Sequence, residues 1–310
     1  MKLGFIIPTY LGERRVALLP EHVLDFHNEI FIESGFGHTM GIGDHEYERV
    51  GCTILSRQDI FAVCDAIFCL KLLQPADFSY LREGQMLIGW THPTGSGSQF
   101  YQTIACEKKL VVVDLDNIYP RVYCGAQVID IPFIPKNFVW KNSFLAGIAS
   151  VEHALLSYGM MPSSETKVAV LASGNVSQGS YNYLAKFGCD IRMFYRKTMI
   201  EFYDTLEVYD VIVNGIEMDQ CGQHILTKEQ LARLKRGCLV IDAAADAGNA
   251  IEGTHYTSLS EPMYFEDGLW FYEVNNAPSL LYRNASREIS KAFSQWVYRE
   301  DVQRFKDLLA

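Results

Sequence analysis

Three reactive side chains in the first half of the chain each follow an apolar run typical of a buried strand. They are Arg15 after residues 3–7, Lys71 after residues 66–70 and His92 after residues 86–90. In an open α/β sheet, ligands bind beyond the carboxyl ends of the strands. An arginine there can hold a carboxylate with its two-pronged guanidinium group. A double arginine such as Arg14-Arg15 is by itself usually surface charge, but three polar groups at three strand ends predict a substrate site.

A second chemical signal lies at residues 167–179, where an apolar strand runs into a tight turn and then a helix. Ala172, Gly174 and Ser177 occupy the three glycine places of a dinucleotide fingerprint, and Gly179 follows two residues later. The N–H groups at such a helix start bind a pyrophosphate. An ordinary strand-to-helix turn in a nucleotide-free, flavodoxin-like sheet is the alternative. The residues expected to hold the pyrophosphate are Ser173, Gly174, Asn175 and Val176.

The end of the following strand indicates which dinucleotide binds. Enzymes that use NAD usually carry an acid about twenty residues on, which accepts a hydrogen bond from the ribose 2′-hydroxyl. Here residues 190–194 are followed by Tyr195, Arg196, Lys197 and Thr198, with no acid. Two cations and a hydroxyl can hold a 2′-phosphate, so Arg196 and Lys197 predict NADP. A solvated basic loop is the alternative.

Apolar strands that alternate with amphipathic helices must position both sets of residues. Strands are expected at 3–7, 31–32, 66–70, 86–90, 110–113, 168–171, 190–194, 208–213 and 238–241, and helices at 46–51, 57–63, 99–109, 143–158, 176–187, 227–234 and 284–309. Continuous apolar strands separated by helices form parallel sheets that are covered on both faces. The long helix 143–158, with Asn142 as its N-cap and Gly159 as its C-cap, would join two domains.

We therefore predict an α/β protein with two Rossmann-like domains whose parallel sheets flank a cleft. The first domain would comprise residues 1–140 and a C-terminal helix, within residues 281–310, that returns to it. The second, residues 141–280, would be the NADP-binding Rossmann domain.

The composition excludes several classes of function. The chain has 310 residues, of which 49% are hydrophobic, and a net charge of −10. It is too apolar for intrinsic disorder, and too acidic, without a Lys/Arg run, to favour nucleic acid or an anionic membrane. No apolar stretch approaches the roughly 20 residues of a membrane span, and the first residues show no signal peptide.

The cysteines and histidines indicate the state of the thiols, the cellular compartment and whether a metal site is present. The eight cysteines include no Cys-x-x-Cys pair, and the eight histidines lack metal-ligand spacing. We expect reduced thiols, no metal site and a cytoplasmic protein; disulfides are the alternative.

The ordered motifs together resemble the alanine dehydrogenase/pyridine nucleotide transhydrogenase superfamily, which also contains fungal-type saccharopine dehydrogenase. The matching segments are Arg15–Pro20, Glu33–Gly51, Lys71, His92, Val240–Gly248 and Val274–Pro278. The resemblance covers essentially the whole chain. Stretches such as 89–97 and 191–199 most resemble members that reductively condense pyruvate with the side-chain amine of ornithine or lysine, using NADPH.

The resemblance implies a role for each reactive residue. Arg15 would bind the keto-acid carboxylate, Lys71 would hold or polarise its carbonyl group, and His92 would act as general acid/base. Asp246 would lie near the nicotinamide ribose or the substrate, with a helix N-cap as the alternative. The other residues implied at the cofactor are Asn214, Gly215 and Asn276.

One residue departs from the family pattern. The position after the strand-end lysine is commonly an acid in alanine and saccharopine dehydrogenases, but here it is Leu72. Asp116 could instead supply negative charge to the ammonium group of an amino-acid substrate, or it could only cap a turn. We expect an opine-type synthase that acts on a keto acid and a diamino acid as a homo-oligomer, either a dimer or a tetramer. The alternatives are an alanine dehydrogenase using ammonia, a saccharopine-type enzyme using 2-oxoglutarate, and an inactive NADP-binding sensor.

Overall fold

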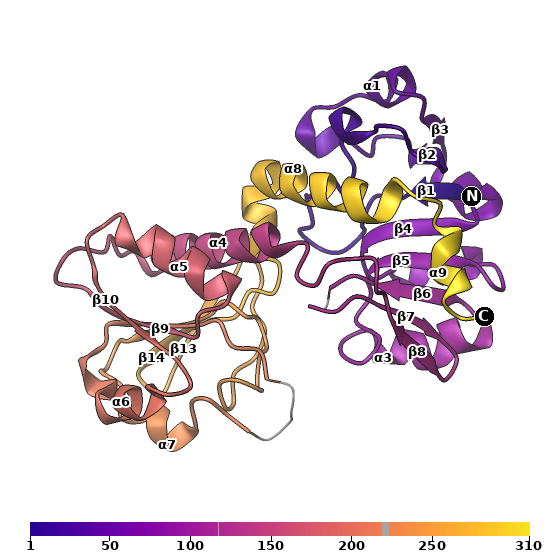
Figure 1. The fold of residues 1–310 in the computed structure, drawn as a ribbon. Coiled ribbons are helices and arrows are strands. Elements are labelled where there is room, and N and C mark those ends of the chain that lie inside the picture. The colour runs from indigo at the N-terminus through magenta and orange to yellow at the C-terminus, as the bar shows by residue number, and fades with distance from the viewer. Residues whose placement is uncertain (117, 219–222) are drawn as a thin grey trace. The chain divides into compact units, whose positions relative to one another are not determined.

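The computed structural model describes residues 1–116, 118–218 and 223–310, which fold into two compact units (Figure 1). The first unit comprises Met1–Val139 and Tyr282–Ala310, and the second comprises Trp140–Leu281. Each unit has its own sheet with a hydrophobic core on both faces. The predicted α/β class is confirmed.

The first unit is built on an eight-stranded sheet in the order β3-β2-β1-β4-β5-β6-β7-β8. Its strands are β1 Lys2–Phe5, β2 Glu29–Glu33, β3 Thr53–Leu55, β4 Ala66–Lys71, β5 Met86–Trp90, β6 Val111–Asp114, β7 Arg121–Cys124 and β8 Gln127–Asp130. Neighbours from β3 to β6 pair in parallel, and β7 and β8 add an antiparallel hairpin. The sequence analysis missed this hairpin because β8 is mostly exposed and shows no apolar run.

Side chains that alternate along the parallel strands bury both faces of this sheet. The helices of the unit are α1 Asp44–Arg49, α2 Arg57–Val63, α3 Ser98–Phe100, α8 Tyr282–Phe293 and α9 Gln303–Asp307. Phe5 and Phe68 belong to the core that α8 covers, whereas Ile6 and Ile67 belong to the core that includes Phe61 of α2. Burial on both faces explains why these strands appear as continuous apolar runs.

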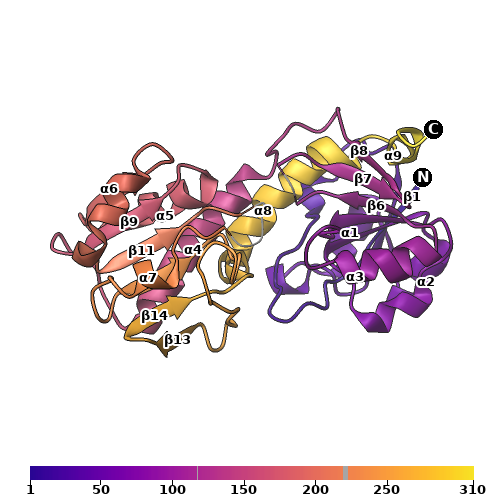
Figure 2. The ribbon, with the colours of Figure 1, turned by 90° about the horizontal axis from the view of Figure 1, so that it is seen from below.

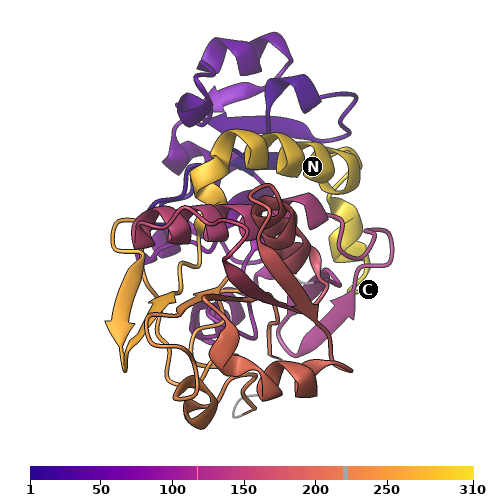
Figure 3. The same cartoon turned by 90° about the vertical axis from the view of Figure 1, so that its left-hand side faces the viewer.

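The C-terminal segment returns to the first unit, as predicted. In Figures 1 and 3 the yellow helix α8 lies along the sheet that the N-terminal strands form, and Ile289 and Phe293 pack into its core. The expected single helix over residues 284–309 is wrong, however. After α8 the chain passes through the π-helical turn Ser294–Tyr298, and α9 begins only at Gln303.

Asn28, which precedes β2, occupies this break in the helix. Its Nδ2 donates to the carbonyl oxygens of Tyr298 (2.9 Å) and Glu300 (2.8 Å), and its Oδ1 accepts from the N–H of Val302 (3.1 Å). Backbone groups that a continuous helix would pair internally are thus satisfied by a buried side chain from the other end of the chain. No local pattern in residues 284–309 could indicate this.

The second unit has a six-stranded sheet in the order β10-β9-β11-β12-β14-β13. Its strands are β9 Lys167–Leu171, β10 Asp190–Phe194, β11 Val211–Asn214, β12 Leu239–Asp242, β13 Met263–Glu266 and β14 Leu269–Tyr272. Its helices are α4 Trp140–Tyr158, α5 Asn175–Ala185, α6 Met199–Asp204 and α7 Lys228–Leu231. All neighbouring strands are parallel except β13 and β14. That hairpin was missed although its turn, Asp267-Gly268, has positive φ at both residues and is a standard hairpin signal.

Only one of the two caps predicted for the long helix α4 is correct. The helix begins at Trp140, so Asn142 lies inside it and is not its N-cap. Gly159 is the expected C-cap: its φ is +76°, and the N–H groups of Gly159 and Met160 bond back to the helix at 3.2 and 3.0 Å.

Two glycines allow α4 and α5 to lie in direct backbone contact, side by side in Figures 1 and 2. A Cβ atom on Gly179 of α5 would lie 1.9 Å from the carbonyl oxygen of Phe144. One on Gly147 of α4 would lie 1.9 Å from the carbonyl oxygen of Val176. Gly179 thus permits the close packing that the third fingerprint glycine usually provides.

Replacing Gly179 with alanine should lower the free energy of unfolding by at least about 2 kcal/mol, since the added methyl group meets backbone that cannot move aside. Gly174→Ala is the matched control: that residue has φ −68° and no atom within 4 Å of an added Cβ, so only the smaller loss of an N-cap glycine, below about 1 kcal/mol, is expected. Urea unfolding of both variants measures the difference. Equal midpoints would contradict the proposed helix contact.

Candidate active site

In the first unit, four predicted site residues lie at one edge of the sheet. Arg15 lies in the loop after β1, Lys71 ends β4, His92 follows β5, and Asp116 follows β6. Strands β1, β4, β5 and β6 are consecutive neighbours and run parallel. Their carboxyl ends therefore bring these side chains to the same edge.

Arg15 is held rigidly by partners that the sequence analysis did not assign. It is only 3% exposed, and its Nε and Nη2 donate to the two oxygens of Glu13 at 2.8 and 2.6 Å. Its guanidinium carbon lies 4.8 Å from the centre of the Trp90 ring. Ser286 of α8 accepts from the N–H of the next residue, Val16, at 2.8 Å, so the returning helix fixes the loop that carries Arg15.

The ammonium group of Lys71 lies between two aromatic rings, 5.3 Å from the centre of Tyr10 and 5.8 Å from that of Trp90. Burial, followed by the nearby positive charge of Arg15, lowers the pKa of Lys71, and Asp116 and Glu13 act in the opposite direction. The amine therefore loses its proton more readily than a solvated lysine would.

His92 pairs with Asp116. The Nδ1 atom of His92 lies 3.2 Å from a carboxylate oxygen of Asp116, and both side chains are about one-third exposed (33% and 39%). Sequence reasoning offered Asp116 as a substrate contact or a turn cap and missed this pairing, because only the β5–β6 register brings the two residues together. A carboxylate on one ring nitrogen orients the imidazole and leaves the other nitrogen to exchange a proton with a ligand.

The backbone around His92 is unusual. Its φ is +46°, a left-handed conformation that is rare for residues other than glycine. The buried carboxylate of Asp114 supports it by accepting from the N–H groups of Thr91 (3.0 Å) and His92 (3.2 Å). The N–H of Gly97 donates to the carbonyl oxygen of His92 at 3.0 Å. A Cβ on Gly97 would lie 1.9 Å from the carbonyl oxygen of Thr91, so only glycine fits there. Such strain, held by several contacts, is typical of functional sites.

In the second unit, the turn after β9 keeps the geometry of a dinucleotide fingerprint although two of its glycines are replaced. Ala172, at the first glycine place, has φ +73°, a conformation that glycine normally adopts. Ser177, at the third, is fully buried, and its hydroxyl donates to the carbonyl oxygen of Leu171 at 2.6 Å. The side chains of the substituted residues are thus absorbed within the turn.

The start of α5 fits a pyrophosphate. The helix is 11 residues long, and no side chain of its N-cap, Gly174, occupies the first turn. Ser173 and Gly174 are exposed. A Cβ atom added to Gly174 would have no other atom within 4 Å, so a ligand can approach there. The N–H groups of a helix start, the positive end of the helix dipole and an open approach together suit a phosphate group.

Arg196 and Lys197 lie in the turn that follows β10, next to β9 in the sheet. Both are exposed. The turn is closed by Thr198, whose hydroxyl accepts from the N–H of Tyr195 at 2.9 Å.

Three further strand ends of the second unit carry the remaining predicted residues. Asn214 ends β11 and is buried; its Nδ2 donates to Ile216 and to Asp242, both at 2.9 Å. Asp246 lies in a turn after β12 and accepts from the N–H of Met218 at 3.0 Å. No helix follows Asp246, so it is not the N-cap that was the alternative. The others are Gly215, whose Cβ would lie 2.2 Å from the Ser177 hydroxyl, and Asn276, 3% exposed after β14.

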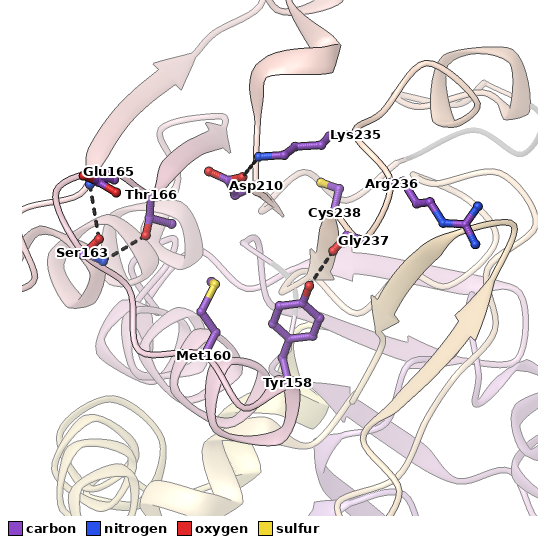
Figure 4. Close-up of a pocket in the computed structure, with 10 residues that line it drawn as sticks. All are labelled: Tyr158, Met160, Ser163, Glu165, Thr166, Asp210, Lys235, Arg236, Gly237 and Cys238. Carbon is purple, nitrogen blue, oxygen red and sulfur yellow. Dashed lines mark hydrogen bonds and ion pairs between the residues drawn. The ribbon is translucent and has the colours of Figure 1, made fainter.

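A polar cavity of about 420 Å³ in this unit lies away from these residues (Figure 4). It is lined by Thr166, Asp210 and Cys238, which precede β9, β11 and β12, so it opens at the amino-terminal edge of the sheet. Asp210 is already paired with Lys235, and the hydroxyl of Tyr158 donates to the Gly237 carbonyl at 2.7 Å. Dinucleotides bind at the opposite edge.

Within the described residues, no cluster of three or more histidine, cysteine or acidic side chains could hold a metal ion. Nor does the described part of the chain contain a helix of the length and apolarity needed to cross a membrane. The seven cysteines with described positions are unpaired, and Cys221 lies outside the described residues.

A strand–turn–helix of the dinucleotide type in one unit, and an arginine, a lysine and a histidine at the strand ends of the other, are typical of enzymes that use a nicotinamide cofactor. Residues 9–122 match the family described as "Alanine dehydrogenase/PNT, N-terminal domain", and residues 150–309 match its "C-terminal domain". The chain belongs to this family and is a nicotinamide-dependent oxidoreductase.

Within the family, the chain is similar to N(5)-(carboxyethyl)ornithine synthases. It is 55% identical to the Clostridium botulinum enzyme of that name, over the whole of this chain and 98% of the relative. It is 50% identical to the Lactococcus lactis enzyme, over 98% of both chains. A solved structure of an L-alanine dehydrogenase superposes with a TM-score of 0.78 at 18% identity, covering 96% of this chain and 89% of the other. That likeness confirms the two-domain Rossmann-like fold.

Proposed function

We propose that the protein catalyses the NADPH-dependent reductive condensation of pyruvate with the side-chain amine of ornithine or lysine. The product would be an N-(1-carboxyethyl) amino acid. The observation that carries the proposal is the grouping of Arg15, Lys71, His92 and Asp116 at one sheet edge, in a chain 55% identical to a relative named for this product. This grouping holds an anion-binding fork, a carbonyl-polarising cation and an acid/base pair.

The residues of the first unit would prepare the substrates. Arg15, aligned by Glu13, binds the carboxylate of pyruvate, and Lys71 donates to the keto oxygen. The substrate amine attacks the polarised carbon, and His92 protonates the hydroxyl group that departs as water. This forms an imine with a positive charge on nitrogen.

Asp116 would have two tasks at this stage. It orients the imidazole of His92, and its negative charge attracts the ammonium group of the incoming substrate. That group gives a proton to His92 before the neutral amine attacks, and Asp116 then favours the positively charged imine. In this way its proposed role as a substrate contact is compatible with its pairing to His92.

The residues of the second unit would hold the cofactor, which supplies the hydride that reduces the imine carbon. Residues Ser173, Gly174, Asn175 and Val176 bind the pyrophosphate at the start of α5. Arg196 and Lys197 bind the 2′-phosphate. Gly215, Asp246 and Asn276 line the nicotinamide end, whereas Asn214, whose amide is bonded internally, shapes the loop there.

The proposal is tested by NADPH oxidation with purified protein and pyruvate, with ornithine, lysine or ammonia in parallel and NADH as a control. Turnover that requires a diamino acid would support it. Turnover with ammonia would instead identify an alanine dehydrogenase. In a further arm 2-oxoglutarate replaces pyruvate, and turnover only there would identify a saccharopine-type enzyme. No turnover with any of these would favour the sensor. Size-exclusion chromatography of the same sample tests the proposed homo-oligomer.

Removing the two cations after β10, in the double variant Arg196→Ala with Lys197→Ala, should raise the KM for NADPH by about 10–100-fold, because charge-assisted hydrogen bonds to the 2′-phosphate are lost. The KM for NADH should not change. Arg192→Ala is the matched control, since Arg192 is an exposed arginine of β10 paired with Glu201 at 3.0 Å. Equal losses with both cofactors would argue against NADP selection by this turn.

A further inference from the structure

Two acidic side chains, Asp242 and Glu273, lie side by side in the interior of the second unit. Asp242 ends β12, and Glu273 directly follows β14. The two strands are parallel, with Ile241 opposite Tyr272, so the next residue of each strand also comes opposite its neighbour, on the same face of the sheet. Both side chains are completely buried, at 0% exposure.

Hydrogen-bond donors are distributed unequally between the two acids. Asp242 accepts from the amide of Asn214 at 2.9 Å and from the N–H groups of Ala244 and Asp246, both at 3.2 Å. Neither side-chain oxygen of Glu273 meets a donor among the described residues. The hydroxyl of Thr254 lies close enough to lower the pKa of Glu273, but it donates to the carbonyl oxygen of Ile251 at 3.0 Å.

The charges that act most strongly on Glu273 are also unfavourable to an anion. They belong to Asp242 and Asp246, and both are negative. Another titratable group nearby is the hydroxyl of Tyr264 on β13, which is buried and neutral. A buried, unpaired carboxylate beside two others is among the most costly arrangements in a protein interior. One proton on Glu273 replaces this repulsion with a hydrogen bond.

We propose that Glu273 is a neutral carboxylic acid that donates a hydrogen bond to the carboxylate of Asp242 and thereby positions the turn that carries Asp246. Asn214, Asp242 and Glu273 then form one hydrogen-bonded row across three neighbouring strands. Burial, and the charge of Asp242, raise the pKa of Glu273 to about 10. A carboxylic acid kept neutral by an apolar site so that it can donate is an established arrangement.

The row fixes the two loops that carry the nicotinamide-end residues. Asp242 closes the turn to Asp246, in which Ala245 has the left-handed φ of +57°. Asp246 in turn accepts from Met218 in the loop after β11 and from Asn249 at 2.7 Å. Glu273 is therefore a positioning residue for Asp246. Its effect on turnover rests on the proposed function, but its protonation state can be measured without turnover.

The first test is infrared spectroscopy at pH 7 on the wild-type protein and Glu273→Gln, an isosteric variant that retains a donor to Asp242. The wild-type-minus-variant spectrum should contain the C=O stretching band of a protonated carboxyl group, displaced in D₂O. Glu266→Gln, at an exposed glutamate of β13 in the same hairpin, should give no such band. A difference spectrum with only carboxylate bands would overturn the proposal.

The second test is the pH dependence of Tm. Folding raises the pKa of Glu273 from its ordinary 4.5 to about 10. The bound proton therefore contributes fully to stability below pH 4.5, and this contribution is lost as the pH rises toward about 10. The Tm of the wild type relative to Glu273→Gln should therefore fall by on the order of 10–20 °C between pH 5 and pH 9. Asp242→Asn removes the neighbouring charge and so lowers the pKa of Glu273. In that background the fall in Tm should end at a lower pH. A constant Tm difference across this range would contradict the shared proton.

Discussion

Replacing His92 with asparagine is expected to lower kcat for NADPH oxidation, in the presence of pyruvate and ornithine, by about 10²–10⁴-fold. Asparagine tolerates the left-handed backbone that His92 adopts at φ +46°, so the loop should keep its shape. It cannot exchange a proton. Under the proposed function, loss of the hydroxyl group as water would then depend on solvent alone.

The control for this experiment is another histidine of the first unit. His27 is exposed and pairs with Glu300 at 3.2 Å, so His27→Asn removes an imidazole–carboxylate pair outside the site. NADPH affinity, measured by the quenching of protein fluorescence, should be the same in the wild type and both variants. Full activity in His92→Asn would remove His92 from the mechanism, whereas loss of NADPH binding would indicate a structural defect.

Replacing Lys71 with methionine is expected to lower kcat/KM for pyruvate by about 10²–10³-fold, the usual effect of removing a charged group that stabilises a developing oxyanion. Methionine preserves the apolar stem between Tyr10 and Trp90, so packing should be retained. Lys109→Met removes an exposed lysine paired with Glu83 at 2.6 Å and should have no effect.

The pH dependence distinguishes a catalytic charge from a structural one. Burial and Arg15 lower the pKa of Lys71 from 10.5, so the charge and the rate should be lost at a lower pH than for a solvated lysine. The arginine of the Lys71→Arg variant stays positively charged throughout the alkaline pH range. Its residual activity should therefore not decline in the alkaline range. If both enzymes show the same alkaline limb, a different group is titrating.

The strand ends of both sheets could be predicted from the sequence because the signals are local. Buried parallel strands form continuous apolar runs, and Lys71, His92 and Gly174 follow such runs directly. Arg196 and Lys197 could be placed in the same way, one strand after the nucleotide turn. The exposed strand β8 and the break after α8 could not, because neither leaves an apolar pattern of its own.

The tertiary structure alone decided which side chains act on one another. Glu13 forms an ion pair with Arg15, Asp116 pairs with His92, and Glu273 lies beside Asp242. Except for the first, these partners are 24 or more residues apart, and they meet because their strands are neighbours in a particular order and register. An apolar run specifies that a strand forms and where it ends. Which strand lies beside it depends on the packing of the whole unit, and so, therefore, does the charge that each reactive group experiences.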